Sequence, residues 1–146
     1  VMDHLSDTDV VIGAAAPADW RPAQVSLEKL KKSEGLDSIP LARCEDILSE
    51  VGRRKKTQIT VGFAAETCDL IENARHKLMS KNLDLIVAND VSRRDAGFES
   101  DFNEVKLLYP DGNREDLPYM TKREVAHKIL DRVTSLLPLT RPISDA

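Results

Sequence analysis

The sequence predicts a three-layer, Rossmann-like α/β domain with a mainly parallel sheet and a β-hairpin near its carboxyl end. Three short apolar runs, each bounded by polar residues, alternate with segments of helical periodicity, which is the pattern of βαβ units. Aromatic residues make up only 4% of the chain. The core must therefore consist mainly of Val, Ile, Leu and Ala, as in a parallel sheet covered by helices on both faces. The length of 146 residues fits one domain, and we expect residues 1–146 to form it.

The first buried strand is expected from Val10 to Ala16, where an apolar run ends in small residues. Residues 17–22 include two prolines. Because proline removes a backbone donor and restricts the residue before it, this segment is expected to be a loop that leaves the end of the strand. A basic cluster at 29–32 and a polar turn at 33–35 follow, and residues 36–42 are a weaker strand candidate.

A short helix is expected from Glu45 to Arg54, followed by a second buried strand from Gln58 to Ala65. Thr67 is suited to cap the next helix, because its hydroxyl can accept a hydrogen bond from an unpaired backbone N–H. Apolar residues then recur every three or four positions up to Asn82, which indicates a helix with one buried stripe. A third buried strand from Leu83 to Ala88 completes the strand-helix-strand unit.

The last part of the chain predicts a hairpin and a helix. Residues 104–109 and 117–120 are the expected strands, joined by the turn signal Asp111-Gly112. An amphipathic helix is expected over residues 121–136. Its inward-facing residues are expected to be Val125, Ile129, Leu130 and Val133.

Composition excludes several classes of function. The net charge of −4 argues against a general nucleic-acid or membrane-surface binder, which needs clustered positive charge in excess. The sequence has no apolar run long enough for a membrane span and no basic-then-apolar leader, so a cytoplasmic location is expected. Cys44 and Cys68 form no CxxC pair and have no neighbouring His, which argues against a zinc site, a disulfide framework or a cysteine nucleophile. The opening Val1-Met2-Asp3-His4-Leu5 is typical of the end of a helix, so further residues are expected upstream.

Three loops leave the carboxyl ends of the expected strands, at residues 13–19, 62–67 and 88–90. In an open parallel sheet, ligands bind in the crevice beyond these ends. Small side chains in the first two loops would let a ligand approach the backbone, where unpaired amides can read a base or cradle a phosphate. A second interpretation stays open, in which these small residues only allow a helix to pack on the sheet.

The charged candidates also have two interpretations each. Asp19 is suited to hold Mg²⁺ together with phosphate oxygens, or to pair with Arg21. Lys29 and its basic neighbours are suited to neutralise a polyphosphate, or to form a solvated surface. Lys77 and Lys81 lie four residues apart on one helix face, where a nucleotide would supply the acceptor between them. Alternatively, they are cations favoured by the helix dipole near its carboxyl end.

Four blocks of this sequence resemble, in order and spacing, the phosphopantothenoylcysteine synthetase part of the bifunctional coenzyme A biosynthesis flavoproteins of bacteria. They are GAAAPADWRP at 13–22, EKLKK at 28–32, VGFAAET at 61–67 and KNLDLIVANDV at 81–91. The resemblance identifies the chain as the carboxyl-terminal half of the synthetase domain. The family's amino-terminal part, with a glycine-rich turn and a required Asn, has no counterpart here, so these residues alone are expected to be inactive.

The resemblance implies a CTP-dependent ligation in coenzyme A biosynthesis. The carboxylate of 4′-phosphopantothenate attacks the α-phosphate of CTP and releases pyrophosphate, and the amine of cysteine then displaces CMP from the acyl-cytidylate. Mg²⁺ is the implied cofactor and a homodimer or larger assembly the implied state, while FMN is implied only if a flavin-dependent decarboxylase is fused upstream. The alternative is a non-catalytic nucleotide-binding or assembly module on the same half fold. A nicotinamide site is disfavoured because no G-x-G-x-x-G follows a strand.

The resemblance also implies the site residues. Lys29 is the implied catalytic residue and contacts the CTP phosphates, and Asp19 contacts both the nucleotide and the cation. Phe63, Lys77 and Lys81 are expected to face the base or sugar, with CTP preferred over ATP. One departure is that Cys44-Glu45-Asp46-Ile47 replaces an Asn-Pro-Asp-Ile type segment. The remaining implied CTP-binding residues are Gly13, Ala14, Ala15, Glu45, Asp46, Ile47 and Leu48.

Overall fold

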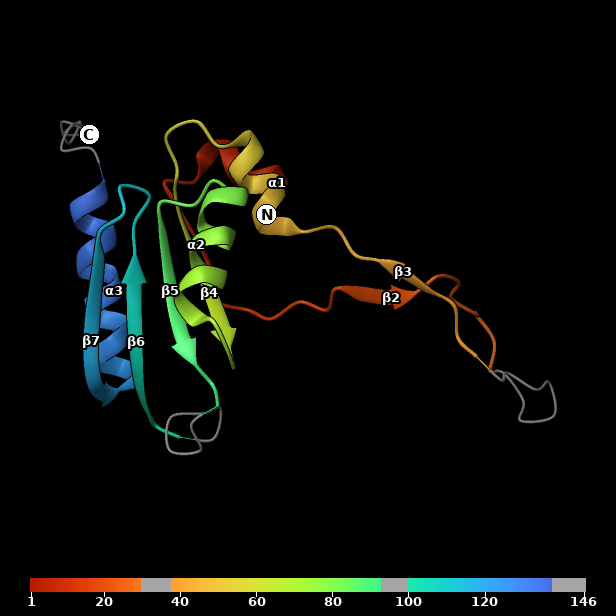
Figure 1. Cartoon of the computed structure of the whole chain (residues 1–146). Coiled ribbons are helices and arrows are strands. Elements are labelled where there is room, and N and C mark those ends of the chain that lie inside the picture. The colour runs from red at the N-terminus through yellow and green to blue at the C-terminus, as the bar shows by residue number, and fades with distance from the viewer. Residues whose placement is uncertain (30–37, 93–99, 138–146) are drawn as a thin grey trace.

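The computed structural model describes residues 1–29, 38–92 and 100–137 (Figure 1). A five-stranded sheet with the order β1-β4-β5-β6-β7 forms the body of the protein. The first three of these strands are parallel neighbours, as predicted, and β6 and β7 continue the sheet as an antiparallel hairpin. The strands are β1 (Val10–Gly13), β4 (Ile59–Glu66), β5 (Leu85–Asp90), β6 (Phe102–Leu108) and β7 (Arg114–Thr121).

The register of the parallel strands sets the shape of the sheet edge at which they end. Gly13, the last residue of β1, is paired with Gly62, whereas β4 and β5 stay paired as far as Glu66 and Asp90. The first strand is therefore shorter than expected, since Ala14 to Ala16 already belong to the segment that leaves the sheet. Because β4 and β5 extend past the last residue of β1, the edge of the sheet is stepped at the end of β1.

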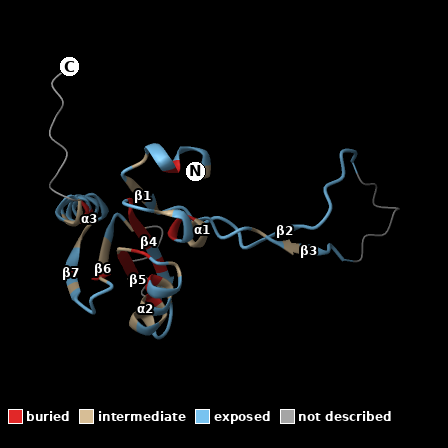
Figure 2. Ribbon diagram, turned by 90° about the horizontal axis from the view of Figure 1, so that it is seen from above, coloured by how far each residue is buried: buried red, intermediate tan, exposed pale blue. Residues whose placement is uncertain are grey.

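Helices cover both faces of the sheet, which confirms the three-layer prediction (Figure 2). Leu85 and Val87 of β5 pack in the core beneath α3 (Lys122–Leu136). Ile86 and Ala88, which alternate with them, pack on the opposite face against α2 (Leu70–Ser80). The short helix α1 (Ile47–Arg54) joins this second face through Leu48. Across the described ranges, no helix combines the length and apolar character needed to cross a membrane.

One predicted helix cap, Thr67, and one predicted inward-facing residue, Leu130, differ from the structure. Thr121 and Glu124 form the capping box of α3, with the Glu124 amide 3.2 Å from the Thr121 hydroxyl. The residue before α2 is Asp69, in a left-handed conformation and without a side-chain cap, so the predicted Thr67 cap is wrong. The reason is that β4 runs on to Glu66 and the chain must turn before the helix can begin. Leu130 is 49% exposed because it lies about 100° around the helix from the buried stripe.

Between β1 and α1 the described residues 20–29 and 38–43 form an arm that extends away from the sheet (Figures 1 and 2). The arm carries the antiparallel strands β2 (Trp20–Pro22) and β3 (Leu41–Arg43). The loop predicted at 17–22 is wrong for its last three residues, which form β2. A proline is tolerated in such a strand at the edge of a two-stranded ribbon, because no neighbouring strand needs its missing donor. The predicted strand over 36–42 begins only at Leu41 within the described residues, and positions 36 and 37 lie outside them.

The opening residues form a short 3-10 helix, η1 (Met2–Asp7). Its residue Leu5 is buried, and the Leu5 carbonyl accepts a hydrogen bond of 2.9 Å from the side-chain amide of Gln58. This contact ties η1 to the start of β4, at the end of the sheet opposite the carboxyl ends of the parallel strands.

Candidate functional site

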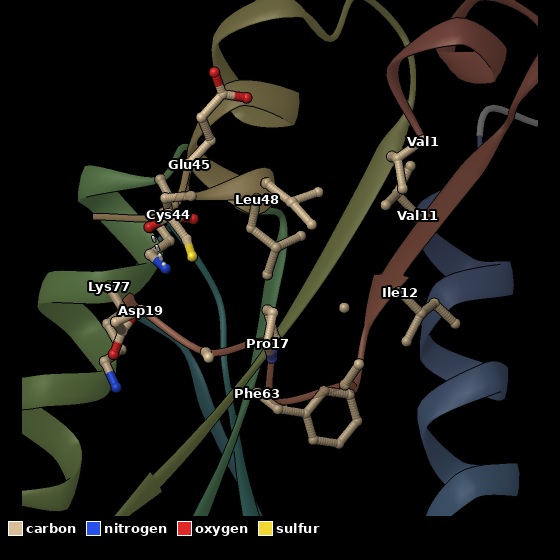
Figure 3. A pocket seen from close by; sticks show the side chains of 16 residues that line it. Val1, Val11, Ile12, Pro17, Asp19, Cys44, Glu45, Leu48, Phe63 and Lys77 are labelled. Atoms are coloured by element: carbon tan, nitrogen blue, oxygen red, sulfur yellow. Dashed lines mark ion pairs between the residues drawn. The ribbon is translucent and has the colours of Figure 1, made fainter. Parts of the chain in front are cut away.

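A pocket of about 410 Å³ lies at the carboxyl end of β1, between β4, α1 and α2 (Figure 3). This volume is in the range of small-molecule and cofactor sites. Its position matches the prediction that the strand-end loops form the site. Apart from Ala14 and Lys29, the pocket brings together all of the predicted nucleotide contacts. These are Gly13, Ala15, Asp19, Glu45, Asp46, Ile47, Leu48, Phe63, Lys77 and Lys81.

Gly13 at the end of β1 leaves room for Leu48 of α1, and Gly62 within β4 leaves room for Leu83 before β5. A Cβ atom on Gly13 would lie 2.6 Å from a methyl carbon of Leu48, and one on Gly62 would lie 2.5 Å from a methyl carbon of Leu83. Both separations are far below van der Waals contact, so a larger residue would require the Leu48 or Leu83 side chain to shift. Gly13 thus serves close packing and, together with Ala15, it also lines the pocket.

The amino end of α1 forms one wall of the pocket, and Asp46 organises it. Its Oδ1 atom accepts a hydrogen bond of 3.0 Å from the Ser49 amide and so caps the helix. Its Oδ2 atom lies 2.8 Å from the Lys81 ammonium. Partial burial alone would raise the pKa of Asp46, but the hydrogen bonds from Lys81 and Ser49 outweigh it and hold this pKa below the ordinary value. Asp46 therefore stays ionised at neutral pH.

Lys77 of α2 (Figure 3) and Lys81, the residue that follows α2, both line the pocket. Each ammonium is already paired with a carboxylate. Lys77 lies 2.5 Å from Glu66, and Lys81 lies 2.8 Å from Asp46. The acceptors that relieve the repulsion between the two lysines are thus side chains of the protein itself.

The charges that line the pocket nearly cancel. Among the lining side chains that the structure describes, there are three carboxylates, of Asp19, Glu45 and Asp46, and two ammonium groups, of Lys77 and Lys81. A triphosphate needs a clear excess of positive charge or a bound cation. The α2 side of the pocket is therefore better suited to an uncharged base or sugar than to phosphates.

Asp19 turns toward the pocket from the base of the arm (Figure 3). Its backbone carbonyl accepts a hydrogen bond of 2.8 Å from the Cys44 amide, which fixes both residues where β2 and β3 meet the body. Asp19 and Arg21, both in the described ranges, form no ion pair in the structure. The oxygen donors of Asp19 suit a hard cation such as Mg²⁺. No group of three acidic, His or Cys side chains suited to a metal occurs within the described ranges. A cation at Asp19 would thus take its other ligands from phosphate oxygens and water.

Two predicted residues and one predicted loop lie outside the pocket. Lys29 is exposed on the arm, and its basic neighbours Lys31 and Lys32 lie outside the described residues. Ala14 is exposed and is not a lining residue. The third predicted loop, residues 88–90, is wrong, because these residues still belong to β5. The Asn89 side-chain oxygen is buried there without a hydrogen-bond partner among the described residues, and Asn89 does not line the pocket.

Several residues that line the pocket were not predicted from the sequence. Cys44, for which no ligand contact was predicted, is half-buried and points its sulfur into the pocket (Figure 3). Its position directly before the predicted contacts Glu45 to Leu48 was the available signal. The other lining residues outside the predicted set are Val1, Val11, Ile12, Pro17 and Ala18.

The fold and the pocket together define an α/β protein with a ligand pocket at the carboxyl ends of parallel strands. The chain belongs to the family described as the DNA/pantothenate metabolism flavoprotein C-terminal domain, whose family model matches residues 1–137.

Individual relatives agree with this family. The coenzyme A biosynthesis bifunctional protein CoaBC of Bacillus subtilis (strain 168) is 49% identical over 136 residues, covering 93% of this chain and 34% of that protein. The CoaBC protein of Vibrio vulnificus (strain YJ016) is 41% identical, covering 94% of this chain and 35% of that protein. The crystal structure of the C-terminal domain of a CoaBC protein matches with a TM-score of 0.73 and 38% identity, covering 92% of this chain and 58% of that one. The chain thus spans about a third of the length of these curated relatives.

Proposed function

We propose that this chain is part of a phosphopantothenate–cysteine ligase that works in coenzyme A biosynthesis in the cytoplasm. In the proposed reaction, CTP activates the carboxylate of 4′-phosphopantothenate as an acyl-cytidylate with release of pyrophosphate. The amine of cysteine then attacks the acyl carbon, CMP leaves, and the amide forms. The observation that carries the proposal is one pocket that unites the predicted nucleotide contacts, except Ala14 and Lys29, from separate segments of the chain.

The geometry suggests how CTP would lie in the pocket. The apolar face of Phe63 and the paired lysines on the α2 side suit the cytosine and ribose. The phosphates would then extend toward the backbone around Gly13 to Ala15 and toward Asp19. Such a site accelerates ligation by aligning the carboxylate with the α-phosphate and by stabilising the charge that develops, without a protein nucleophile. The amine that forms the amide belongs to the substrate cysteine. The half-buried Cys44 therefore has no role in bond formation in this proposal.

Asp19 is the residue proposed to hold Mg²⁺, which would supply neutralisation of the phosphate charge. The described side chains that line the pocket carry one more carboxylate than ammonium groups, so Lys29 is the second proposed source of positive charge. The arm carries Lys29, and β2 of that arm begins immediately after Asp19. The proposed catalytic lysine and the proposed metal ligand are therefore linked through the same segment.

We further propose that the protein acts as a homodimer and that the arm contributes to its interface. A two-stranded ribbon without a core is only marginally stable by itself in water. On this arm Trp20 and Leu41 are 49% and 58% exposed, although both belong to paired strands. A second copy of the chain would cover these side chains. The base of the arm holds Asp19 and Cys44, so dimer formation would also stabilise the pocket.

The test is calorimetric titration of the full-length protein with CTP and with ATP, combined with a coupled assay. We expect tighter binding of CTP, pyrophosphate release that requires CTP and 4′-phosphopantothenate, and amide formation that also requires cysteine. Equal affinity for the two nucleotides would count against the assignment of Phe63, Lys77 and Lys81. Tight CTP binding without pyrophosphate release would instead favour a non-catalytic nucleotide-binding module.

A further inference from the structure

Glu66 ends β4 and holds the ammonium of a pocket lysine without lining the pocket itself. Its Oε1 atom lies 2.5 Å from the Lys77 Nζ atom, and its side chain is 18% exposed. The backbone of Glu66 is fixed as well, since its carbonyl accepts a hydrogen bond of 3.1 Å from the Val91 amide. The carboxylate is therefore anchored to the sheet, whereas Lys77 reaches it through four methylene groups.

We infer that Glu66 is a positioning residue that aims Lys77 at the base or sugar of the nucleotide. This inference rests on the proposed function, because the ligand it assumes is CTP. A lysine ammonium has three N–H donors, and one of them is occupied by Glu66. The pairing leaves the other donors free to point toward the pocket. It also restricts the side chain before the ligand arrives, which lowers the entropic cost of binding.

The ion pair also decides which part of a nucleotide Lys77 can recognise. With its charge balanced by Glu66, Lys77 offers directed hydrogen bonds rather than net attraction to an anion. Directed donors discriminate between bases or sugar positions, whereas an unpaired ammonium would attract any polyphosphate. Removing Glu66 should therefore weaken CTP binding and reduce the preference for CTP over ATP at the same time.

The neighbouring pair shows the contrast. Asp46 lies 2.8 Å from Lys81, but this carboxylate lines the pocket itself and is more exposed, at 48%, than its lysine, at 27%. The Lys77 side chain is 41% exposed and the Glu66 side chain 18%, so the ammonium is accessible from the pocket and its partner is mostly covered. This is the arrangement expected where the carboxylate positions a group that contacts the ligand, rather than contacting the ligand itself.

The experiment is a double-mutant cycle in the full-length protein with Glu66→Ala, Lys77→Ala and the double variant. Glu72→Ala is the matched control, because Glu72 is an exposed carboxylate on α2 that does not line the pocket. Titration with CTP and ATP gives affinities, and thermal melts check the fold. The rate of reductive methylation at Lys77, followed by mass spectrometry without nucleotide, reports the ion pair directly.

We expect Glu66→Ala to weaken CTP binding about tenfold, with the double variant no weaker than Lys77→Ala alone, as for residues that act through one contact. Methylation of Lys77 should be faster in Glu66→Ala than in wild type and unchanged in Glu72→Ala. Additive losses, an unchanged CTP-to-ATP ratio or unchanged methylation would each overturn the inference. If wild type binds no CTP at all, the proposed function fails, and with it the role of Glu66 toward that ligand. This failure is recognisable because it appears before any substitution is made.

Discussion

Asp46 and Lys81 join the start of α1 to the end of α2 through one carboxylate. The Oδ1 atom of Asp46 caps α1, and its Oδ2 atom lies 2.8 Å from the Lys81 ammonium, which follows the last residue of α2. The two walls of the pocket that come from these helices are thus held by a single residue. Asp46 keeps this place even though Cys44 and Glu45 depart from the family's segment.

Two substitutions at Asp46 should separate its cap from its ion pair. Asp46→Asn retains a good N-cap and loses the ion pair, which is worth under about 1 kcal/mol at this partly exposed site. Asp46→Ala loses both and should cost about 0.5–2 kcal/mol in the free energy of unfolding.

The pKa of Asp46 is lowered from 3.8 on folding, so its ionised form stabilises the native state above that pH. The difference between wild type and Asp46→Asn should shrink as pH falls through the folded-state pKa. Urea denaturation between about pH 7 and pH 2.5 tests this, and a pH-independent difference would contradict it.

Gly52→Ala should destabilise the protein although Gly52 lies in a helix. Helix propensity alone favours alanine by about 1 kcal/mol. However, a Cβ atom at this position would lie 1.9 Å from the backbone carbonyl oxygen of Lys81, which cannot rotate away. Overpacking of this kind costs about 1–3 kcal/mol, so the net effect should be a loss. Urea denaturation measures the sign directly, and a gain in stability would show that α1 moves away from Lys81 at little cost.

CTP should protect Cys44 from alkylation. Cys44 is half-buried and lines the pocket, whereas Cys68 is exposed and lies outside the lining set, which makes it an internal control. Mass spectrometry after treatment with a maleimide gives the modification rate of each cysteine with and without nucleotide. We expect CTP to slow the reaction at Cys44 and to leave Cys68 unchanged. Equal rates at Cys44 in both conditions would place the nucleotide elsewhere.

Lys29→Gln in the full-length protein should severely reduce amide formation without unfolding it. A contact with the phosphates that strengthens as pyrophosphate leaves acts more on the rate than on ground-state binding. Single contacts of this kind are worth about 2.7–4 kcal/mol, or roughly a hundredfold to a thousandfold in rate. An exposed lysine without such a role changes stability by under about 0.5 kcal/mol. Pyrophosphate release and thermal melts are the measurements, with Lys56→Gln as an exposed control outside the pocket. Near-normal turnover would favour the other interpretation, in which Lys29 is part of a solvated surface without a role in the reaction.

Leu41→Glu should shift the proposed dimer toward monomer. Leu41 is 58% exposed on β3 of the arm, so a charged residue there leaves the core intact but opposes burial against a second copy. Sedimentation velocity of the full-length protein measures the association. Leu130→Glu is the matched control, because Leu130 is similarly exposed, at 49%, but lies on α3. An unchanged dimer in Leu41→Glu, or an equal loss in both variants, would argue against the arm as the interface.

Residue patterns in the sequence were sufficient for the layers and the direction of the strands. The apolar runs at Ile59 and Leu85 are buried between two helical layers, and the helix between β4 and β5 requires a parallel crossover. The prediction that the run at Val10 is equally buried is wrong, because β1 is the edge strand and its residues are half-buried or exposed. The turn at Asp111-Gly112 could be predicted from residue type, because glycine readily adopts the positive φ that such turns need. In the structure Gly112 has a φ of 91°. These features depend on short stretches of chain, so local preference and hydrophobic period were enough to predict them.

Only the tertiary structure decided the contacts between residues far apart in the sequence. The pairing of Lys77 with Glu66 and of Lys81 with Asp46 depends on how α2 lies against β4 and α1, which no local pattern specifies. The same holds for Cys44, whose place in the pocket follows from the hydrogen bond between its amide and the carbonyl of Asp19. The family resemblance predicted most of the residues that line the pocket, because residues that contact a shared ligand occupy matching positions in the sequences of a family. The partners that hold those residues in place follow from packing in three dimensions, which becomes definite only when the layers are assembled.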